Sequence, residues 1–94
     1  MRVKRTDTNQ KQLMNLCRKI PGVSVRSIHT VGHGLGDSIL GYKGKNFLIE
    51  VKDGTKTASR KKLTPDEERF HKEWKGQICI VENFDDILTL IKTA

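Results

Sequence analysis

The stretch that decides the fold is GDSILGYKGKNFLIEVK, residues 36–52. Two runs typical of β-strands, 37–42 and 45–52, are separated by Lys43-Gly44, and glycine readily adopts the positive φ that a two-residue hairpin turn requires. The stretch therefore predicts a β-hairpin that closes on this dipeptide. A turn of three residues would instead shift the strand pairing by one position.

This hairpin brings charged side chains onto one face. With the two-residue turn, Tyr42 faces Lys45, and counting outward places Asp37 directly opposite Glu50, with Cβ atoms about 4.5–5.5 Å apart. Lys52 shares their face because strand side chains alternate with period two. Two carboxylates so close need a cation or a raised pKa, and a divalent ion held by them, a backbone carbonyl and waters would supply the cation. The alternative is a solvated stripe of charges on a half-exposed sheet.

Turn and capping signals organise the rest of the chain. Pro21-Gly22 ends a helical pattern of apolar residues, Thr64-Pro65-Asp66-Glu67 has the form of a capping box, and Asn83 can cap a last helix. We expect a helix over 8–20, a strand over 23–28, the two hairpin strands, a helix from Pro65 to about Trp74, a strand over 77–81 and a last helix whose Phe84, Ile87, Leu88 and Ile91 share one face. The order αβββαβα predicts one compact α/β domain over residues 1–94, with a mixed central sheet flanked by helices.

The composition indicates a polyanionic partner. Eighteen Lys and Arg against 11 Asp and Glu give a formal net charge of +7, which suits nucleic acid or an anionic membrane surface. No apolar run approaches the roughly 18 residues that span a bilayer, and MRVKRTDTNQ lacks the apolar stretch of a signal peptide. We expect a soluble cytoplasmic protein of a bacterium or a phage-infected host cell. Cys17 and Cys79 fit no zinc-binding spacing, and we expect both to be reduced core residues.

The pattern of Asp37, a hairpin and then Glu50-Val51-Lys52 resembles the active-site signature of PD-(D/E)xK nucleases. Within that superfamily the whole chain resembles the virus-type replication-repair nuclease (VRR-Nuc) domain. NQKQLMNLCRKIPG is similar to the first helix of the family, VGHGLGDSILGYKGKNFLIEVKDG to its catalytic hairpin, and KLTPDEERFHKEWKGQ to its closing helix. Two residues differ from the family pattern, which usually has proline at Gly36 and often glutamine at Glu67.

The resemblance implies a restriction-endonuclease-like core and a set of catalytic residues. Asp37, Glu50 and the Val51 backbone carbonyl would hold Mg²⁺ or Mn²⁺, which helps to generate hydroxide and neutralises charge that builds on the phosphate. Lys52 would orient or deprotonate the attacking water, or stabilise the pentavalent phosphorus.

Further polar residues are candidates for supporting roles. Gln10 lies on the apolar side of the first helix, where it could face the metal or complete a cap with Asp7. Glu67 could act in the site or only in its capping box, and His71 could contact phosphate or pair with Glu67. His29 and His33 border the site in sequence, where surface positions are more common than ligands.

Basic residues around the hairpin are the candidate DNA contacts. They contact phosphate without reading sequence, although each could also be ordinary solubilising charge. The candidates are Lys43 and Lys45 at the hairpin tip, Lys56, Arg60, Lys61 and Lys62 after the second strand, and Arg2, Lys4 and Arg5 in the N-terminal segment. The glycine-rich GHGLGD is followed by a strand and lacks a Walker lysine, so we expect no nucleotide cofactor.

Together these features predict a metal-dependent, structure-selective DNA endonuclease. The resemblance to single-domain members of the family implies a homodimer that cuts branched DNA such as four-way (Holliday) junctions. Two symmetry-related active sites would suit paired nicks in such a substrate. The alternative is a non-catalytic nucleic-acid-binding module that keeps the fold and uses its charge only for docking.

Overall fold

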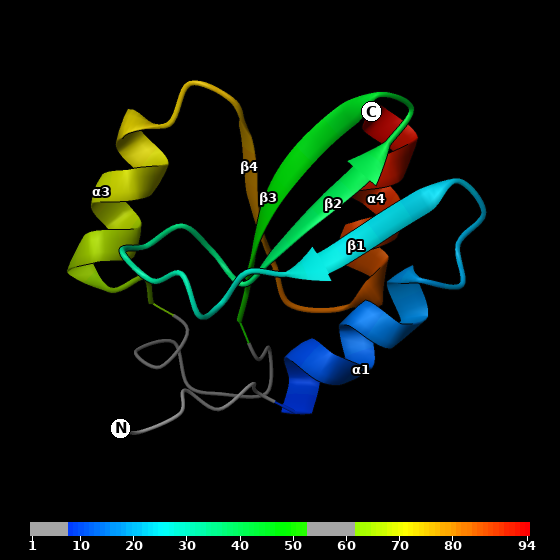
Figure 1. Cartoon of the computed structure of the whole chain (residues 1–94), viewed down its shortest axis with the longest axis horizontal. Helices are drawn as coiled ribbons and strands as arrows, with labels where there is room; N and C mark the ends of the chain where they lie inside the picture. The colour runs from blue at the N-terminus through cyan, green and yellow to red at the C-terminus, as the bar shows by residue number, and fades with distance from the viewer. Residues whose placement is uncertain (1–7, 53–61) are drawn as a thin grey trace.

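The computed structural model describes residues 8–52 and 62–94, and the elements within these ranges follow the predicted order (Figure 1). They are α1 (Thr8–Cys17), β1 (Val23–Ser27), β2 (Ser38–Tyr42), β3 (Lys45–Val51), α3 (Pro65–Glu73), β4 (Gln77–Val81) and α4 (Phe84–Thr93). The first helix ends three residues before the predicted Ile20. Lys19 and Ile20 there donate backbone hydrogen bonds to residues only three positions back, which tightens the turn before Pro21-Gly22.

The four strands form one mixed sheet in the order β1-β2-β3-β4. The first three strands are antiparallel, and β4 runs parallel to β3 after the crossover through α3. Tyr42 pairs with Lys45 as predicted, and both turn residues have positive φ, 50° at Lys43 and 79° at Gly44. These values are those of a type I′ turn, whose twist matches that of the flanking strands.

The ladder between β2 and β3 ends one residue before Asp37. The last pair is Ser38 with Ile49, yet the Asp37 N–H also donates to the Ile49 carbonyl over 2.8 Å. Two consecutive residues thus oppose one residue of β3, as in a β-bulge, and the Asp37 carbonyl accepts a hydrogen bond from Ile28 N–H. The prediction that Asp37 and Glu50 form a regular ladder pair is therefore wrong, because the bulge displaces Asp37 from the strand.

The main core lies on one face of the sheet, where α1 and α4 sit next to each other (Figure 1). Cys17 is buried in this core and Cys79 is partly buried at its border, both as free thiols, as predicted. The buried members of the core are Leu13, Met14, Cys17, Val25, Leu40, Phe47, Ile49, Val51, Val81 and Ile87.

Helix α3 stands apart from α1 and α4, beside the segment that joins β1 to β2 (Figure 1). Its predicted capping box is confirmed, because the Thr64 hydroxyl accepts from the Glu67 N–H and the Glu67 carboxylate accepts from the Thr64 N–H. The predicted cap of α4 is confirmed too, since the Asn83 side chain accepts from the Asp86 N–H over 2.9 Å. Within residues 8–52 and 62–94 no helix is long and apolar enough to cross a bilayer.

Candidate active site

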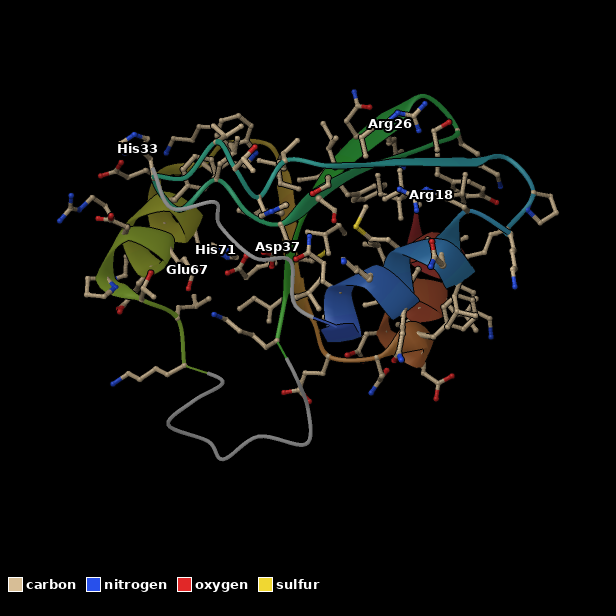
Figure 2. The ribbon with its side chains drawn as sticks, turned by 60° about the horizontal axis from the view of Figure 1, so that its bottom comes forward. Arg18, Arg26, His33, Asp37, Glu67 and His71 are labelled. Atoms are coloured by element: carbon tan, nitrogen blue, oxygen red, sulfur yellow. The ribbon has the colours of Figure 1, made fainter. Side chains whose placement is uncertain are left out.

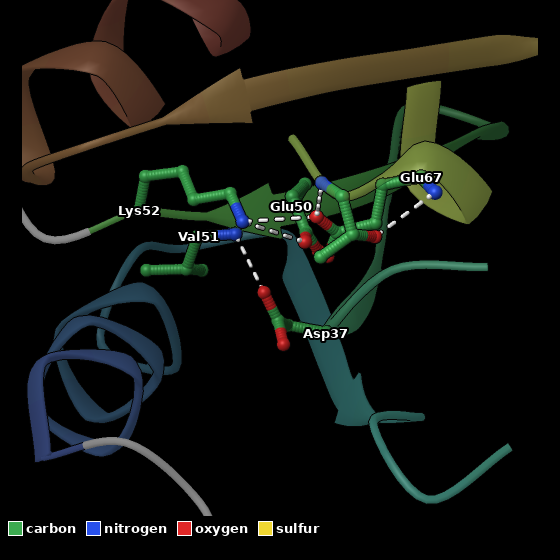
Figure 3. Close-up of polar contacts among 6 residues, drawn as sticks. Asp37, Glu50, Val51, Lys52 and Glu67 are labelled. Atoms are coloured by element: carbon green, nitrogen blue, oxygen red, sulfur yellow. Dashed lines mark hydrogen bonds and ion pairs between the residues drawn. The ribbon is translucent and has the colours of Figure 1, made fainter. Parts of the chain in front are cut away.

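Three carboxyl groups and one ammonium group meet at the end of β3 (Figure 3). Glu50 is only 3% exposed, although glutamate is rarely buried in proteins unless it has a partner. The Lys52 Nζ lies 3.0 Å from Glu67 Oε1 and 3.5 Å from Glu50 Oε1, and Asp37 Oδ2 accepts a hydrogen bond of 2.7 Å from Val51 N–H. The fold therefore brings together the residues that the sequence singled out.

The backbone of Val51 faces Asp37. The Lys52 N–H donates to the Val81 carbonyl over 2.9 Å, so the peptide groups of Lys52 point toward β4. In an extended strand the N–H and the carbonyl of one residue point to the same side, and this side alternates along the chain. Because the Val51 N–H points to Asp37, the Val51 carbonyl also lies on the Asp37 side of the strand, where the resemblance would have it serve as a ligand.

Burial and neighbouring acids raise the pKa of Glu50. Desolvation is the largest cause, followed by contacts with Glu67 and Asp37, and together they raise the pKa to about 10. The buried carboxyl therefore keeps its proton at neutral pH and is a hydrogen-bond donor to its neighbours. Buried, closely spaced carboxyls favour a retained proton in this way, even beside the single cation of Lys52.

Glu67 links the first turn of α3 to the site. Burial alone would raise its pKa, but hydrogen bonds with Glu50, the Thr64 backbone and Lys52 outweigh burial and lower the pKa to about 2. The same oxygen, Oε1, accepts from Thr64 N–H at 2.8 Å and from the Lys52 ammonium at 3.0 Å. The sequence left open whether Glu67 caps the helix or acts in the site, and its position allows both.

Lys52 is held as a cation. Burial would lower the pKa of its ammonium group, but the contacts with Glu67 and Glu50 outweigh burial and raise the pKa. A lysine in this state is a hydrogen-bond donor and an electrostatic anchor for negative charge.

Gln10 reaches the site from α1. It is 2% exposed, and its Nε2 donates to the Asp37 backbone carbonyl over 3.1 Å, so it fixes the backbone that carries the acid. The alternative cap with Asp7 lies outside the described residues.

His71 borders the same cluster from α3. Burial is the main cause that lowers the pKa of its imidazole; the charge of Glu67 opposes this shift and the charge of Lys52 adds to it. Its Nε2 atom is buried and has no hydrogen-bond partner among the described residues. Burial therefore disfavours the charged form of His71, and its contact with phosphate stays a prediction.

Two glycines let the β1–β2 segment close around the acids. At Gly34, with φ +78°, a Cβ atom would lie 2.5 Å from the Asp66 carbonyl oxygen, so only glycine permits this approach to α3. At Gly36, with φ +120°, a Cβ atom would meet the Ile49 carbonyl at 3.1 Å. Proline, which the family pattern has here, is locked near φ −65° and cannot adopt this conformation.

The acids open onto a hollow of about 300 Å³. Figure 2 shows Asp37, Glu67 and His71 turned toward a common region, with His33 on the loop above them. His29 and His33 both line the hollow, and the His29 Nδ1 lies 2.6 Å from the Ser27 hydroxyl. Both histidines thus border the candidate site in space as well as in sequence.

Most of the predicted DNA contacts lie elsewhere or outside the described residues. Lys43 and Lys45 occupy the hairpin tip, and β3 advances about 3.3 Å per residue, which places Lys45 roughly 20 Å from the site at Lys52. Lys43 and Lys45 therefore lie about a full strand length from the acids, and their contact with DNA stays a prediction. Lys62 is exposed just before α3. Arg2, Lys4, Arg5, Lys56, Arg60 and Lys61 fall outside the described residues.

Other basic residues, which sequence reasoning missed, lie closer. Lys11 and Arg18 line a hollow of about 290 Å³ that shares His29 with the acid-lined hollow. Arg69 lines a third, of about 160 Å³, which shares His33 and Asp66 with it. The acid-lined hollow thus adjoins one hollow that contains Lys11 and Arg18 and another that contains Arg69 together with Asp66 and Glu73. The signal of these basic residues was weak: Arg18 directly follows α1 and comes seven residues after Lys11, but no pattern tells which way these side chains point.

The oxygen donors fit a hard divalent ion. Asp37, Glu50 and the Val51 carbonyl supply the carboxylate and carbonyl oxygens that Mg²⁺ and Mn²⁺ prefer. In residues 8–52 and 62–94 no three His, Cys, Asp or Glu side chains are arranged as a ready-made metal cage. Two carboxylates with a carbonyl and waters would not form such a group, so this finding leaves the ligand set open.

Comparison with protein-family models, curated proteins and solved structures finds no match to this chain.

Proposed function

We propose that this chain is a metal-dependent, structure-selective DNA endonuclease with a restriction-endonuclease-like core of the VRR-Nuc type. The observation that carries the proposal is the near-complete burial of Glu50 between two further acids and beside Lys52, at the edge of a hollow. Two acids and a lysine at such spacing are the groups that metal-assisted phosphodiester hydrolysis uses.

A structural role does not account for this cluster. Replacing buried ionisable groups by apolar side chains of similar volume is often neutral or stabilising, so a small domain gains little from burying Glu50. A protein that only docks on DNA gains nothing from presenting carboxylates to phosphate, because like charges repel. The cluster is most economically explained by chemistry that needs the acids.

Each residue then has a role. Asp37, Glu50 and the Val51 carbonyl would hold Mg²⁺ or Mn²⁺, which supplies Lewis-acid stabilisation of negative charge on the phosphate. Lys52, held as a cation, stabilises the same developing charge and orients water, and its raised pKa disfavours the alternative role of general base.

Two residues position these groups without touching the phosphate. Glu67 holds the Lys52 ammonium at 3.0 Å, and Gln10 holds the backbone of Asp37 at 3.1 Å. Glu67 can do so because its helix begins at Thr64 and projects this side chain toward β3.

A nucleic-acid strand would cross the acid-lined hollow and the two hollows that adjoin it. Lys11, Arg18 and Arg69 stand along it and would contact phosphates on either side of the acids. Such contacts read the backbone and its shape, which supports structure-selective recognition. The preference for branched DNA such as four-way junctions rests on the resemblance to the VRR-Nuc family.

The test is cleavage of labelled linear, flapped and four-way DNA by the pure protein with Mg²⁺, Mn²⁺ or a chelator. We expect metal-dependent cleavage that favours branched substrates, and none by Asp37→Asn protein. Cleavage in the presence of chelator would reject the mechanism. Binding without cleavage under every metal would favour the non-catalytic nucleic-acid-binding module.

A further inference from the structure

The two edges of the sheet differ in how they are protected. On β1 the exposed positions are polar or charged, including Ser24 and Arg26, which discourages pairing with another strand. β4, QICIV, has no charged residue and no proline, and its Ile80 is 47% exposed. In the described part of the chain no strand pairs with the outer side of β4. This edge therefore has the features of a strand that is covered by a partner.

The backbone of β4 offers hydrogen bonds at alternate residues. The Val81 carbonyl accepts from Lys52 N–H, so the peptide groups of Val81 point inward to β3. By the alternation of an extended strand, those of Cys79 also point inward, and those of Ile78 and Ile80 point outward. Two residues, each with one donor and one acceptor, can thus pair with a new strand.

A groove beside this edge leaves room for a neighbour. It measures about 420 Å³ and lies between residues 79–82 and the Asp86, Thr89, Leu90 and Thr93 side of α4. A helix that flanks an added strand could pack into it.

We propose that β4 pairs antiparallel with β4 of a second copy of this chain, so that two sheets join across a two-fold axis beside Cys79. Ile78 of one copy then exchanges hydrogen bonds with Ile80 of the other, and the reverse. A register centred on Ile80 would instead pair Ile78 with Glu82. That register is excluded because the Glu82 N–H already donates to the Asp86 carboxylate over 2.8 Å.

The charges at the two ends of β4 complement each other in this arrangement. Lys75 precedes the strand, whereas Glu82 and Asp85 follow it. Antiparallel pairing places the basic end of each copy beside the acidic end of the other, which offsets the repulsion between two chains of net charge +7. The interface is self-complementary, as a two-fold dimer requires, and does not depend on the endonuclease proposal.

The first test is the molar mass in solution, measured by analytical ultracentrifugation over a range of concentrations. We expect a dimer for the wild type, and a dissociation constant weakened at least roughly tenfold in Ile80→Lys, because a charge is placed on the paired edge. Val31→Lys is the matched control, since Val31 is 56% exposed on a loop, and it should dimerise as the wild type does. Ile80→Pro removes only an outward N–H and should also dissociate the dimer without disturbing β3.

A monomeric wild type, or a dimer that survives both Ile80 changes in folded protein, would overturn the proposal. The register has its own test on the wild-type sequence. Cys79 of the two copies would face each other at a non-hydrogen-bonded position, where Cα atoms are about 4.5 Å apart and within reach of a disulfide. Oxidation with copper phenanthroline should link the dimer in wild type and Cys17→Ala but not in Cys79→Ser. A dimer that cannot be linked through Cys79 would overturn this register.

Discussion

The two faces of β3 show how one strand divides stability from chemistry. Phe47, Ile49 and Val51 point into the core beneath α1 and α4. On the opposite face Leu48 is followed by Glu50 and then, just past the strand, by Lys52. Both faces are buried, but one buries carbon and the other an acid that retains its proton. The difference teaches that burial alone does not identify a stabilising residue, because Glu50 is as inaccessible as its core neighbours.

The largest expected effect comes from removing charge on the second face. Asp37→Asn keeps a side-chain oxygen that can accept from Val51 N–H but loses the negative charge. We expect DNA cleavage to fall on the order of 10³-fold, since electrostatic stabilisation of the transition state is lost. Lys52→Ala should act similarly. For Asp37→Asn, DNA affinity and the free energy of unfolding should stay close to wild type, and persistent cleavage by clean Asp37→Asn protein would refute the assignment.

The complementary change is made on the core face. Ile49→Ala should lower the free energy of unfolding by about 2–5 kcal/mol, because it leaves a cavity among well-packed side chains. Urea denaturation measures this loss. The cleavage rate per folded molecule should change only severalfold, since the Ile49 side chain points away from the acids. A large loss of cleavage in fully folded Ile49→Ala protein would show that the two faces are not separable.

The close packing of the β1–β2 segment against α3, beside the acids, can be tested with Gly34 and Gly32. Gly34 and Gly32 have nearly equal φ, +78° and +79°, so alanine meets the same backbone strain at both. Only at Gly34 would the new Cβ collide with the Asp66 carbonyl. We expect Gly34→Ala to lose roughly 1–3 kcal/mol more stability than Gly32→Ala in urea denaturation, with a larger loss of cleavage. Equal losses would mean that the loop does not need to press against α3.

Because folded Glu50 retains its proton, the free energy of unfolding depends on pH. The folded-state pKa of about 10 exceeds the ordinary value of 4.5, so above pH 4.5 the unfolded chain releases a proton that the folded chain keeps, and stability falls as pH rises. Glu50→Gln resembles the neutral carboxyl and should stabilise the metal-free protein at pH 7 by roughly 1–3 kcal/mol, with little effect near pH 4. Thermal unfolding in chelator measures both. A destabilised Glu50→Gln protein at pH 7 would contradict the retained proton.

The smallest effect concerns the basic residues. Lys11→Gln with Arg18→Gln removes two charges beside the site, and Lys43→Gln with Lys45→Gln removes two at the distant hairpin tip. The first pair should weaken DNA binding severalfold and reduce the salt dependence by up to about two phosphate contacts, and the second pair should do less. Fluorescence anisotropy at several salt concentrations measures both. Equal effects would indicate that net charge alone matters.

Local signals made most of the fold predictable from the sequence. The turn at Lys43-Gly44 set the hairpin register, and the capping box at Thr64 set the start of α3, because each signal acts within four residues. The same register placed Glu50 and Lys52 on one face of β3, and Asp37 reaches their end of the strand although the bulge removes it from the predicted pairing.

The features that could not be predicted from the sequence depend on tertiary contacts. The bulge at Asp37 is made by a hydrogen bond to Ile49, and Gln10 reaches Asp37 only because α1 packs beneath the sheet. The orientation of helix faces likewise decided that Arg69 lies near the site. Periodicity shows which residues share a helix face but not what that face contacts. From the sequence alone, the role of Glu67 as a helix cap could therefore not be distinguished from its role as the partner of Lys52.

The most direct test of the acid cluster as a cation site is calorimetric titration of the protein with Mn²⁺ at pH 7 in buffers of different ionisation enthalpy. We predict one ion per chain with release of about one proton, because Glu50 must lose its proton to become a ligand, and we predict that Asp37→Asn abolishes both signals. Failure of the wild type to bind Mn²⁺, or equal binding of Mn²⁺ by the Asp37→Asn protein, would contradict the claim that the acid cluster is a cation site.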